Sequence, residues 1–458
     1  MATHILPPFN AAWLAIDSDK TPMHVAGLYI FQKPEDAGPD YLRGLVSDML
    51  RDRNLEAPWN QKLIRPLGVR GLPVLVDDDK MDLDYHIRFS ALPEPGGERE
   101  LGELISRLHS HPLDLDRPLW ECHVIGGLYD DRFAIYVKLH QALAYGPFGV
   151  NALLSTLSED PYQRGLSPVW GTGLDDQAGV PNAVGGGGID AWGRGVVAAG
   201  TSMAGRLTVD RIRRAYSRSA PKSLLTGRVG SRRRVATQVY DQSRVNAVMT
   251  AAGMEQEVLV YYLISTTLRR YLKEYNALPD ESMIAGITVP VEGDPDVTPG
   301  AAIGMIKLAT NKADPLVRLE KLKAGFDKAK AKVAGMNTQA AMLHSLSMMQ
   351  PYIVGAAARS ITGFGTPRIP WNLFISNYHG PDGPLYFNGA PLETYFPVPP
   401  LWQGAGLAVS ALSANGKLGL SVTGDRERVA HMQRLAVYME DAFAGLERAL
   451  TITTEAAQ

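Results

Sequence analysis

The stretch from Phe133 to Gly149 constrains the fold more than any other, because it joins a strand pattern to a helix pattern through a glycine-rich turn. Apolar side chains alternate with a second set along its first half: Phe133, Ile135, Val137 and Leu139 against Ala134, Tyr136, Lys138 and His140. This period of two predicts a half-buried β-strand. Gly146, Pro147 and Gly149 interrupt the strand, and helical spacing resumes at Val150. Since polar groups at the end of a buried strand often form functional sites, we expect one at residues 140–146.

Composition excludes several classes of protein. A chain of 458 residues is long enough for two domains, and a net charge of −2 gives no electrostatic basis for binding nucleic acid. The one cysteine, Cys122, lies in a strand-like run and is expected to be a buried, unreactive thiol. No HExxH or CxxC pattern suggests a metal site. No signal peptide or membrane span is recognisable, so we expect a cytoplasmic protein, with peripheral membrane contact as an alternative.

A change of composition between residues 165 and 234 predicts a linker between two domains, residues 1–164 and 235–458. Gly185 to Gly188 are consecutive glycines, as expected of a flexible connection. Basic side chains then crowd together: Arg206, Arg211, Arg213, Arg214, Arg218, Lys222, Arg228 and Arg232 to Arg234. Such a cluster could hold the phosphates of coenzyme A or of anionic lipids, but a solvated helix explains it equally well.

Strand and helix patterns alternate along both predicted domains, which indicates an α/β protein. In the second half, apolar spacing predicts a helix over 258–272, a strand over 284–291 and a final helix over 429–446. Asn415-Gly416, between two apolar runs, predicts a tight hairpin turn.

Several motifs resemble the wax ester synthase/diacylglycerol acyltransferase family. His140 to Gly146 is similar to that family's HHxxxDG motif, although Gln141 replaces the second histidine and Tyr145 replaces the aspartate. Pro118-Leu-Trp-Glu121 matches a family motif at every residue, and Ser376-Asn377 begins another. The resemblance covers nearly the whole chain outside the linker.

The resemblance implies two chloramphenicol-acetyltransferase-like lobes, with mixed sheets flanked by helices and a tunnel between them. It also implies acyl-CoA as a substrate, a hydrophobic acceptor such as an alcohol or a diacylglycerol, and no cofactor. Contact with a membrane or a lipid droplet would fall to the basic linker, and homodimer formation stays open.

The catalytic candidates are His140, Gln141, Tyr145, Gly146 and His379. In the family, the second histidine removes the proton from the attacking alcohol, whereas an amide such as Gln141 does not titrate and can only form hydrogen bonds. His379 is an extra histidine inside a retained motif and therefore an alternative base. The Tyr145 phenol is better suited to donating a hydrogen bond.

The candidate substrate-binding residues are Pro118, Leu119, Trp120 and Asn377, with a core role favoured for Trp120. The arginine that the family carries after the residues matching Pro290-Val291 is missing, together with the aspartate replaced by Tyr145. Losing both partners avoids leaving one charge buried and unpaired.

Two functions remain open from the sequence. The first is an acyltransferase with a remodelled site, and the second is a non-catalytic relative that binds acyl-CoA or lipid, or that acts as a scaffold.

Overall fold

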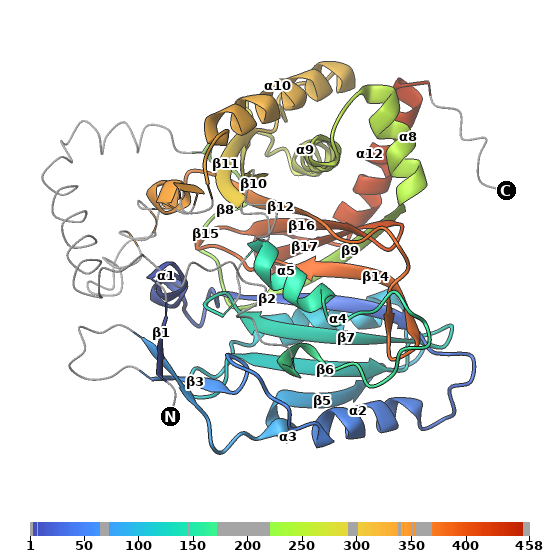
Figure 1. Ribbon diagram of the computed structural model, residues 1–458. Coiled ribbons are helices and arrows are strands. Elements are labelled where there is room, and N and C mark those ends of the chain that lie inside the picture. Colours follow the sequence, from blue (N-terminus) through green and yellow to red (C-terminus); the bar gives the residue numbers. More distant parts are fainter. Residues whose placement is uncertain are drawn as a thin grey trace, which may run out of the picture.

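A computed structural model of the protein describes most of the chain. The described residues are 3–6, 8–64, 73–143, 146–171, 220–291, 301–337, 340–341, 343–349, 352, 355 and 369–451. Gly185 to Gly188, most of the predicted linker and Tyr145 lie outside them. Two six-stranded sheets with flanking helices dominate the structure (Figure 1). The α/β class expected from the sequence is therefore confirmed.

The first sheet, called the N-sheet here, is centred on β2 and β7. Its strands in hydrogen-bonded order are β13 (Tyr386–Phe387), β14 (Ala390–Val398), β2 (His24–Gln32), β7 (Arg132–His140), β6 (Trp120–Gly126) and β5 (Ile87–Ala91). Only β5 and β6 run parallel. Because β13 and β14 come from the C-terminal half of the sequence, the N-sheet contains strands from both sides of the predicted linker.

The second sheet, called the C-sheet here, is also mixed. Its strands in order are β11 (Ala301–Lys307), β10 (Ile284–Pro290), β12 (Leu373–His379), β16 (Leu407–Ala414), β17 (Lys417–Asp425) and β9 (Arg233–Asp241). β12 pairs in parallel with β10 and β16, and the other neighbours are antiparallel. Asn415 and Gly416 adopt φ values of 53° and 67° between β16 and β17, which confirms the predicted hairpin.

Helices cover both sheets. Those beside the N-sheet are α2 (Tyr41–Arg51), α3 (Leu83–His86), α4 (Glu98–Ser110) and α5 (Gly146–Leu154). Those on the outer face of the C-sheet are α8 (Gln242–Ala252), α9 (Gln256–Glu274), α10 (Pro315–Val333) and α12 (Arg434–Ala449) (Figure 1). In the described part of the chain, no helix combines the length and apolar composition that crossing a bilayer requires.

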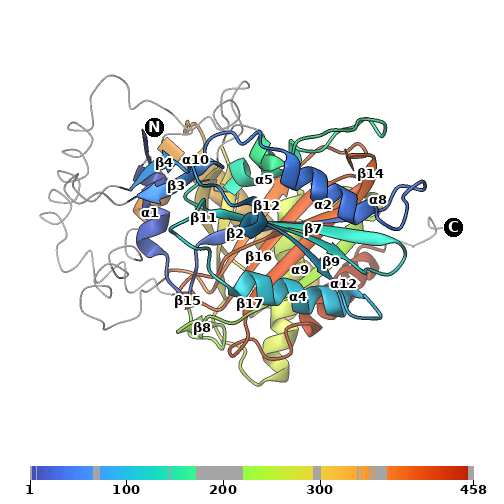
Figure 2. The ribbon, with the colours of Figure 1, turned by 90° about the horizontal axis from the view of Figure 1, so that it is seen from below.

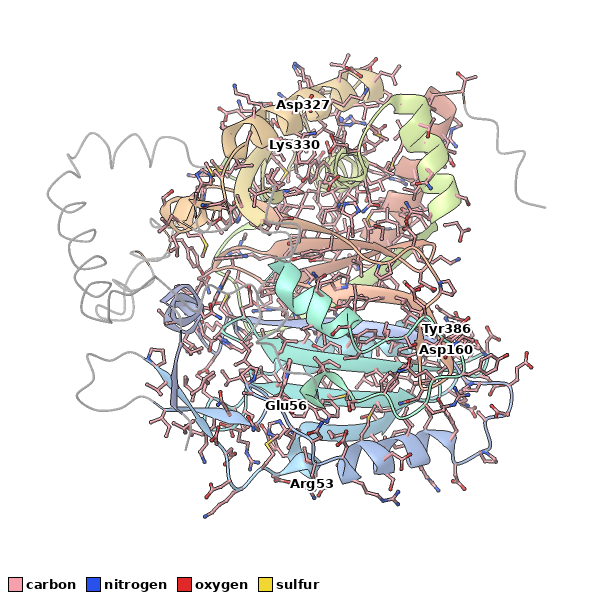
Figure 3. The ribbon with its side chains drawn as sticks, viewed as in Figure 1. Arg53, Glu56, Asp160, Asp327, Lys330 and Tyr386 are labelled. Atoms are coloured by element: carbon pink, nitrogen blue, oxygen red, sulfur yellow. The ribbon has the colours of Figure 1, made fainter. Side chains whose placement is uncertain are left out.

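Smaller elements lie at the edges of this arrangement. They are α1 (Pro8–Ile16), the strands β1 (Thr3–Ile5), β3 (Gln61–Ile64) and β4 (Val74–Asp77), and the short pair β8 (Thr226–Gly227) and β15 (Gly404–Ala405). After α5 the chain meets β13, where Tyr386 and Ser158 exchange backbone hydrogen bonds of 2.7 and 2.9 Å near the labelled Asp160 (Figure 3).

β7 has the predicted alternation but is buried on both faces. Phe133, Ile135 and Val137 pack in one cluster with α2 and α5, while Ala134 and Tyr136 pack in another with α4. The expectation of a half-buried strand was therefore wrong, because α4 covers the face that carries the polar side chains.

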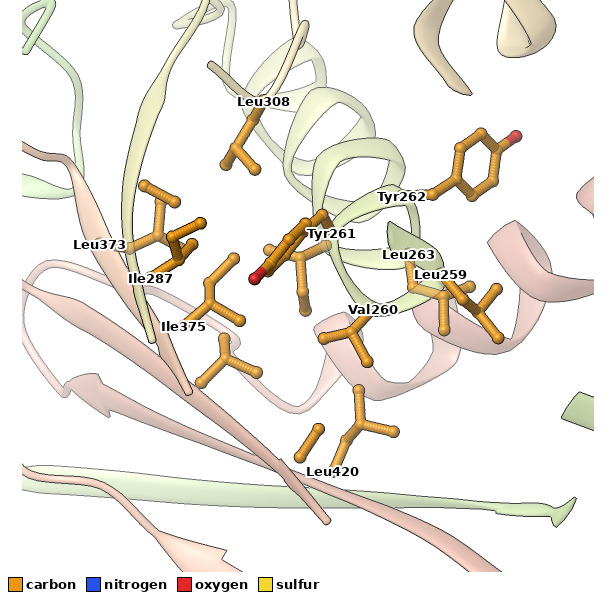
Figure 4. Packing of buried hydrophobic residues seen from close by; sticks show 14 of the residues in the cluster. Leu259, Val260, Tyr261, Tyr262, Leu263, Ile287, Leu308, Leu373, Ile375 and Leu420 are labelled. Carbon is orange, nitrogen blue, oxygen red and sulfur yellow. The ribbon is translucent and has the colours of Figure 1, made fainter. Parts of the chain in front are cut away.

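The core of the C-sheet is built around α9. Tyr261, Leu263 and their neighbours pack against Ile287 and Ile375 of the sheet (Figure 4). α9 is buried over most of its length because α10 and α12 pack beside it. The helix predicted over 258–272 is confirmed and extends two residues further at each end.

Candidate active site

The loop that follows β7 is fixed by backbone hydrogen bonds. The His140 N–H donates to the Leu119 carbonyl at 3.0 Å, and the Gln141 N–H donates to the Met23 carbonyl at 2.9 Å. The Leu143 N–H closes a turn on the His140 carbonyl at 2.9 Å. β6 and the start of β2 therefore hold residues 140–143 on either side, and little conformational freedom remains to be lost when a substrate binds.

Asn10 adds a side-chain contact to the same loop. Its Nδ2 donates to the Ala142 carbonyl at 2.8 Å, and both residues are buried. Asn10 comes from α1, more than a hundred residues earlier in the chain. It was missed as a site residue, because this contact joins segments that lie far apart in the sequence.

His140 is held by a hydrogen bond to one of its ring nitrogens. Its Nδ1 accepts a hydrogen bond of 3.0 Å from the Ala142 N–H, so the proton of the neutral ring lies on Nε2. Nε2 faces Asp17 Oδ1 at 3.6 Å, and the side chain is only 2% exposed. Burial and the hydrogen bond at Nδ1 fix the orientation of the ring. His140 therefore orients the loop that carries Gln141.

The loop lies where the two halves of the molecule meet. Ala142 and Leu143 belong to a buried cluster that also contains Trp371 and Trp402 from the C-terminal half. β14 of the N-sheet packs on β16 and β17 of the C-sheet beside this region. A side chain carried by the loop is consequently positioned by both halves.

Gln141 is buried at the end of β7, and Gly146 is the first residue of α5. Tyr145 lies outside the described residues.

The Pro118-Leu-Trp motif supports the site from behind. Trp120 is fully buried, stacks on Trp170 at 4.7 Å between ring centroids, and donates its indole N–H to the Trp59 carbonyl at 2.8 Å. Pro118 and Leu119 are buried as well. The contact from this motif to the loop is the Leu119 carbonyl that receives the His140 N–H.

Asn377 and His379 meet the beginning of α9. Gln256 Nε2 donates to Asn377 Oδ1 at 3.3 Å, and His379 Nε2 lies 3.0 Å from Glu257 Oε1. The second ring nitrogen of His379 lies 3.2 Å from Ser413 Oγ. The hydrogen bond to Glu257 raises the pKa of His379, although burial opposes it.

The alternation of β12 separates His379 from the loop. Leu373 and Ile375 pack in the core beneath α9, whereas Phe374 and Tyr378 pack with the clusters of the N-terminal half. Because side chains alternate along a strand, His379 shares the α9 face with Leu373 and Ile375. The structure therefore does not bring His379 together with His140.

A pH-dependent contribution to stability is expected from the pair of His379 and Glu257. The His379 pKa is raised above 6.5, so its contribution is complete below that pH and is lost as pH rises through the folded-state value. Burial raises the pKa of Glu257, but the interaction with His379 and other hydrogen bonds lower it by a larger amount, so that it lies below 4.5. The contribution of Glu257 to stability is therefore lost in acid. His379→Gln should therefore destabilise most between pH 4.5 and 6.5, by less than about 1 kcal/mol because His379 is half exposed. Urea unfolding at pH 5.5 and 8.5 measures the difference.

Glu257→Gln is the matched control, and combining it with His379→Gln should add no further pH-dependent loss. The same destabilisation at both pH values would contradict the assignment. If His379→Gln instead abolished acyl transfer while leaving stability unchanged, His379 would return as a candidate base.

Buried polar residues form a network behind the loop that the sequence did not predict. Lys138, only 1% exposed, lies 3.2 Å from Glu121 Oε2 and donates to the carbonyl of His111 at 3.0 Å. His109 of α4 contacts the Tyr136 hydroxyl at 2.8 Å and the Pro399 carbonyl at 3.2 Å. Burial lowers the pKa of His109 to about 3, so the ring stays neutral.

Two other chemical features of the described residues bear on the site. Burial raises the pKa of the Cys122 thiol to about 12, in agreement with the unreactive thiol predicted. Among the described residues, no group of three or more histidine, cysteine, aspartate or glutamate side chains is placed to hold a metal ion.

Comparison with solved structures first identifies the class of fold. The first condensation domain of the calcium-dependent antibiotic synthetase aligns over 98% of this chain and 97% of its own, with a TM-score of 0.54 and 14% identity. At that identity the similarity concerns the fold alone, and it supports the two-lobed α/β architecture.

Sequence comparison then identifies the family. The models of the wax ester synthase/diacylglycerol acyltransferase catalytic domain and of the WS/DGAT C-terminal domain match residues 6–256 and 300–447. The chain belongs to the wax ester synthase/diacylglycerol acyltransferase family.

Individual relatives match along the whole chain. A Mycobacterium tuberculosis protein named for diacylglycerol O-acyltransferase activity is 35% identical, over 97% of this chain and 100% of its own. The O-acyltransferase WSD of Acinetobacter baylyi is 31% identical, over 95% of each. The wax ester synthase/diacylglycerol acyltransferase of Marinobacter aquaeolei VT8 superposes with a TM-score of 0.78 and 30% identity, covering 98% of this chain and 100% of that one.

Proposed function

We propose that the protein transfers an acyl group from acyl-CoA to the hydroxyl group of a hydrophobic acceptor. The observation that carries this proposal is the fixed loop of residues 140–143 at the junction of the two halves. The loop donates hydrogen bonds to the carbonyls of Leu119 and Met23 and accepts one from Asn10. Family membership and the O-acyltransferase names of relatives that match the full length support the same chemistry.

The reaction joins the acceptor oxygen to the thioester carbonyl carbon and breaks the carbon–sulfur bond. The hydroxyl proton leaves the acceptor oxygen, and the departing CoA thiolate takes up a proton, so the reaction neither releases nor consumes protons overall. A base at the site would therefore relay a proton without consuming it. Positioning the two reactants supplies a further and separate part of the rate enhancement.

Gln141 replaces the base with an amide. The Nε2 amide group of Gln141 can donate a hydrogen bond to the developing oxyanion or hold the acceptor hydroxyl, but it cannot take up the proton. Loss of a general base typically lowers a rate by about two to four orders of magnitude. The transferase proposed here is consequently slow with simple alcohols.

Release of CoA tests the proposal. With palmitoyl-CoA and either hexadecanol or a diacylglycerol, we expect acceptor-dependent thiol release together with the corresponding ester, both detected by mass spectrometry. Calorimetry with palmitoyl-CoA alone should give binding in the micromolar range, about −8 kcal/mol.

Two results would contradict the proposal. Binding of palmitoyl-CoA without ester from any hydroxyl acceptor would favour the non-catalytic alternative. Absence of binding would exclude both acyl transfer from palmitoyl-CoA and a non-catalytic role in binding it, and would leave lipid binding or scaffolding.

A further inference from the structure

A basic cleft lies between α4 and the start of β9, outside the loop described above. Its volume is about 500 Å³. Its lining includes Arg107, Arg232, Arg233, Arg234 and Arg426. α4 runs beside β9 here (Figure 2), and the Oγ atoms of Ser106 and Ser110 accept hydrogen bonds from the backbone of β9.

The cleft carries an excess of positive charge. Five arginines line it, against the carboxylates of Asp19 and Glu103. Glu103 already pairs with Arg99 at 3.4 Å, on the neighbouring turn of α4. Within the described ranges, Arg107, Arg232, Arg234 and Arg426 form no ion pair within 4.0 Å, so their charge is available to an anion.

Two of these arginines stand next to each other. The Arg426 N–H donates to the Arg232 carbonyl at 3.0 Å, at the point where β17 and β9 meet. Both side chains are exposed and carry the same charge. Like charges in neighbouring positions repel each other, and an anion bound between them would remove that cost.

Arg233 supplies a buried positive charge at the base of the cleft. It is 3% exposed and donates to the carbonyls of Gly230 and Lys20 at 2.6 and 2.5 Å. The nearby Asp425 uses its carboxylate oxygens to accept backbone N–H groups, including that of Gly230 at 2.6 Å. The positive charge of Arg233 is therefore only partly balanced.

The cleft is connected to the loop of the candidate active site. Arg233 holds the carbonyl of Lys20, three residues after Asp17. Asp17 accepts the Met23 N–H at 2.6 Å and faces His140 at 3.6 Å, while the Met23 carbonyl receives the Gln141 N–H. One short segment, residues 17–23, therefore links the floor of the cleft to the loop.

From this arrangement we infer that the cleft binds the phosphate groups of acyl-CoA, with Arg232 and Arg426 contacting them directly. The inference rests on the proposed function for the identity of the ligand. Phosphates recognised in this way include the 3′-phosphate and the diphosphate of the nucleotide, since guanidinium groups pair well with phosphate oxygens. The thioester end of the same molecule would then extend toward residues 140–143.

Binding measurements on the double variant Arg232→Gln/Arg426→Gln test the inference. The affinity for palmitoyl-CoA should fall by about tenfold or more, since two charge-assisted contacts are lost. The affinity for palmitoyl-N-acetylcysteamine, a thioester without phosphates, should not change. Adenosine 3′,5′-bisphosphate, which has phosphates but no acyl chain, should bind the wild type and lose affinity in the variant.

The matched control removes two positive charges elsewhere. Arg53 and Arg448 are exposed, and within the described part of the chain neither forms an ion pair; Arg53 is labelled at the outer end of the N-terminal half (Figure 3). Arg53→Gln/Arg448→Gln changes the net charge equally and should bind palmitoyl-CoA as the wild type does. A general effect of charge would appear in both double variants.

The outcomes separate the cleft from the proposed function. Bisphosphate binding that depends on Arg232 and Arg426, without acyl transfer, would support phosphate binding in the cleft and contradict the proposed function. Acyl transfer with equal palmitoyl-CoA affinity in both double variants would overturn the inference about the cleft and leave the proposed function standing. If Arg232→Gln/Arg426→Gln weakened binding only to phosphatidylglycerol vesicles, and not to either nucleotide, lipid headgroups would be the source of the phosphate and the inference would be overturned.

Discussion

Replacing Gln141 with histidine is expected to raise the rate of ester formation from palmitoyl-CoA and a long-chain alcohol by about two orders of magnitude or more. The backbone of residue 141 is already fixed by its hydrogen bond to the Met23 carbonyl, so the new imidazole would be carried by an ordered loop. An imidazole titrates near the pH of the assay, whereas the amide does not titrate at all. The measurement is kcat/KM for ester formation between pH 5.5 and 8.5.

The shape of the pH profile distinguishes base catalysis from better binding. With Gln141→His, the rate should rise with pH through the pKa of the new imidazole, because only the neutral ring accepts a proton. Gln141→Asn keeps an amide at the same position and should produce no gain. No gain from Gln141→His, in a protein that still binds palmitoyl-CoA, would mean that the acceptor is not an alcohol or a diacylglycerol.

Restoring the aspartate as well should be harmful. Tyr145→Asp adds a carboxylate for which the sequence lacks the family's arginine after Pro290-Val291. An unpaired carboxylate removed from water destabilises a protein substantially. We therefore expect Gln141→His/Tyr145→Asp to unfold at a lower urea concentration than Gln141→His alone. Equal stability of the two variants would show that position 145 is solvated or paired.

The second large effect is expected at Lys138. Lys138→Met should lower the free energy of unfolding by about 3–5 kcal/mol, because it leaves Glu121 buried without its ammonium partner. Burial alone would raise the pKa of Glu121, but hydrogen bonds from His123 and Lys138 and the charges of Lys138 and Arg88 outweigh it and lower the pKa to about 2. This carboxylate therefore stays ionised at neutral pH. The substitution also removes the donor to the carbonyls of Leu108 and His111 at the end of α4. Urea unfolding at pH 7 measures the loss.

Two comparisons test the cause of that loss. Glu121→Gln/Lys138→Met has no buried charge pair and should recover part of the stability lost by Lys138→Met. Arg43→Met breaks an exposed pair with Asp40, 3.4 Å apart, and should cost less than about 1 kcal/mol. If the double variant were as unstable as Lys138→Met, packing and not charge would explain the loss.

Local patterns in the sequence were sufficient to predict many elements. The alternation from Phe133 to His140, the helical spacing around Leu259 and the Asn415-Gly416 turn each correspond to an observed element. These features depend on backbone geometry and on neighbours within a few residues, and those neighbours can be read from the sequence. The motif resemblance likewise identified the family, because its residues lie close together in the sequence.

Only the tertiary structure decided how these elements surround the site. β14 joins β2 in the N-sheet although more than 350 residues separate them in the chain, and α4 buries the polar face of β7. The side chain of Asn10 holds the loop, His140 is turned toward Asp17, and the alternation of β12 directs His379 toward α9. Such contacts depend on which distant surfaces pack together. The free energy that selects them comes from burial shared among many residues, so no single local pattern records it.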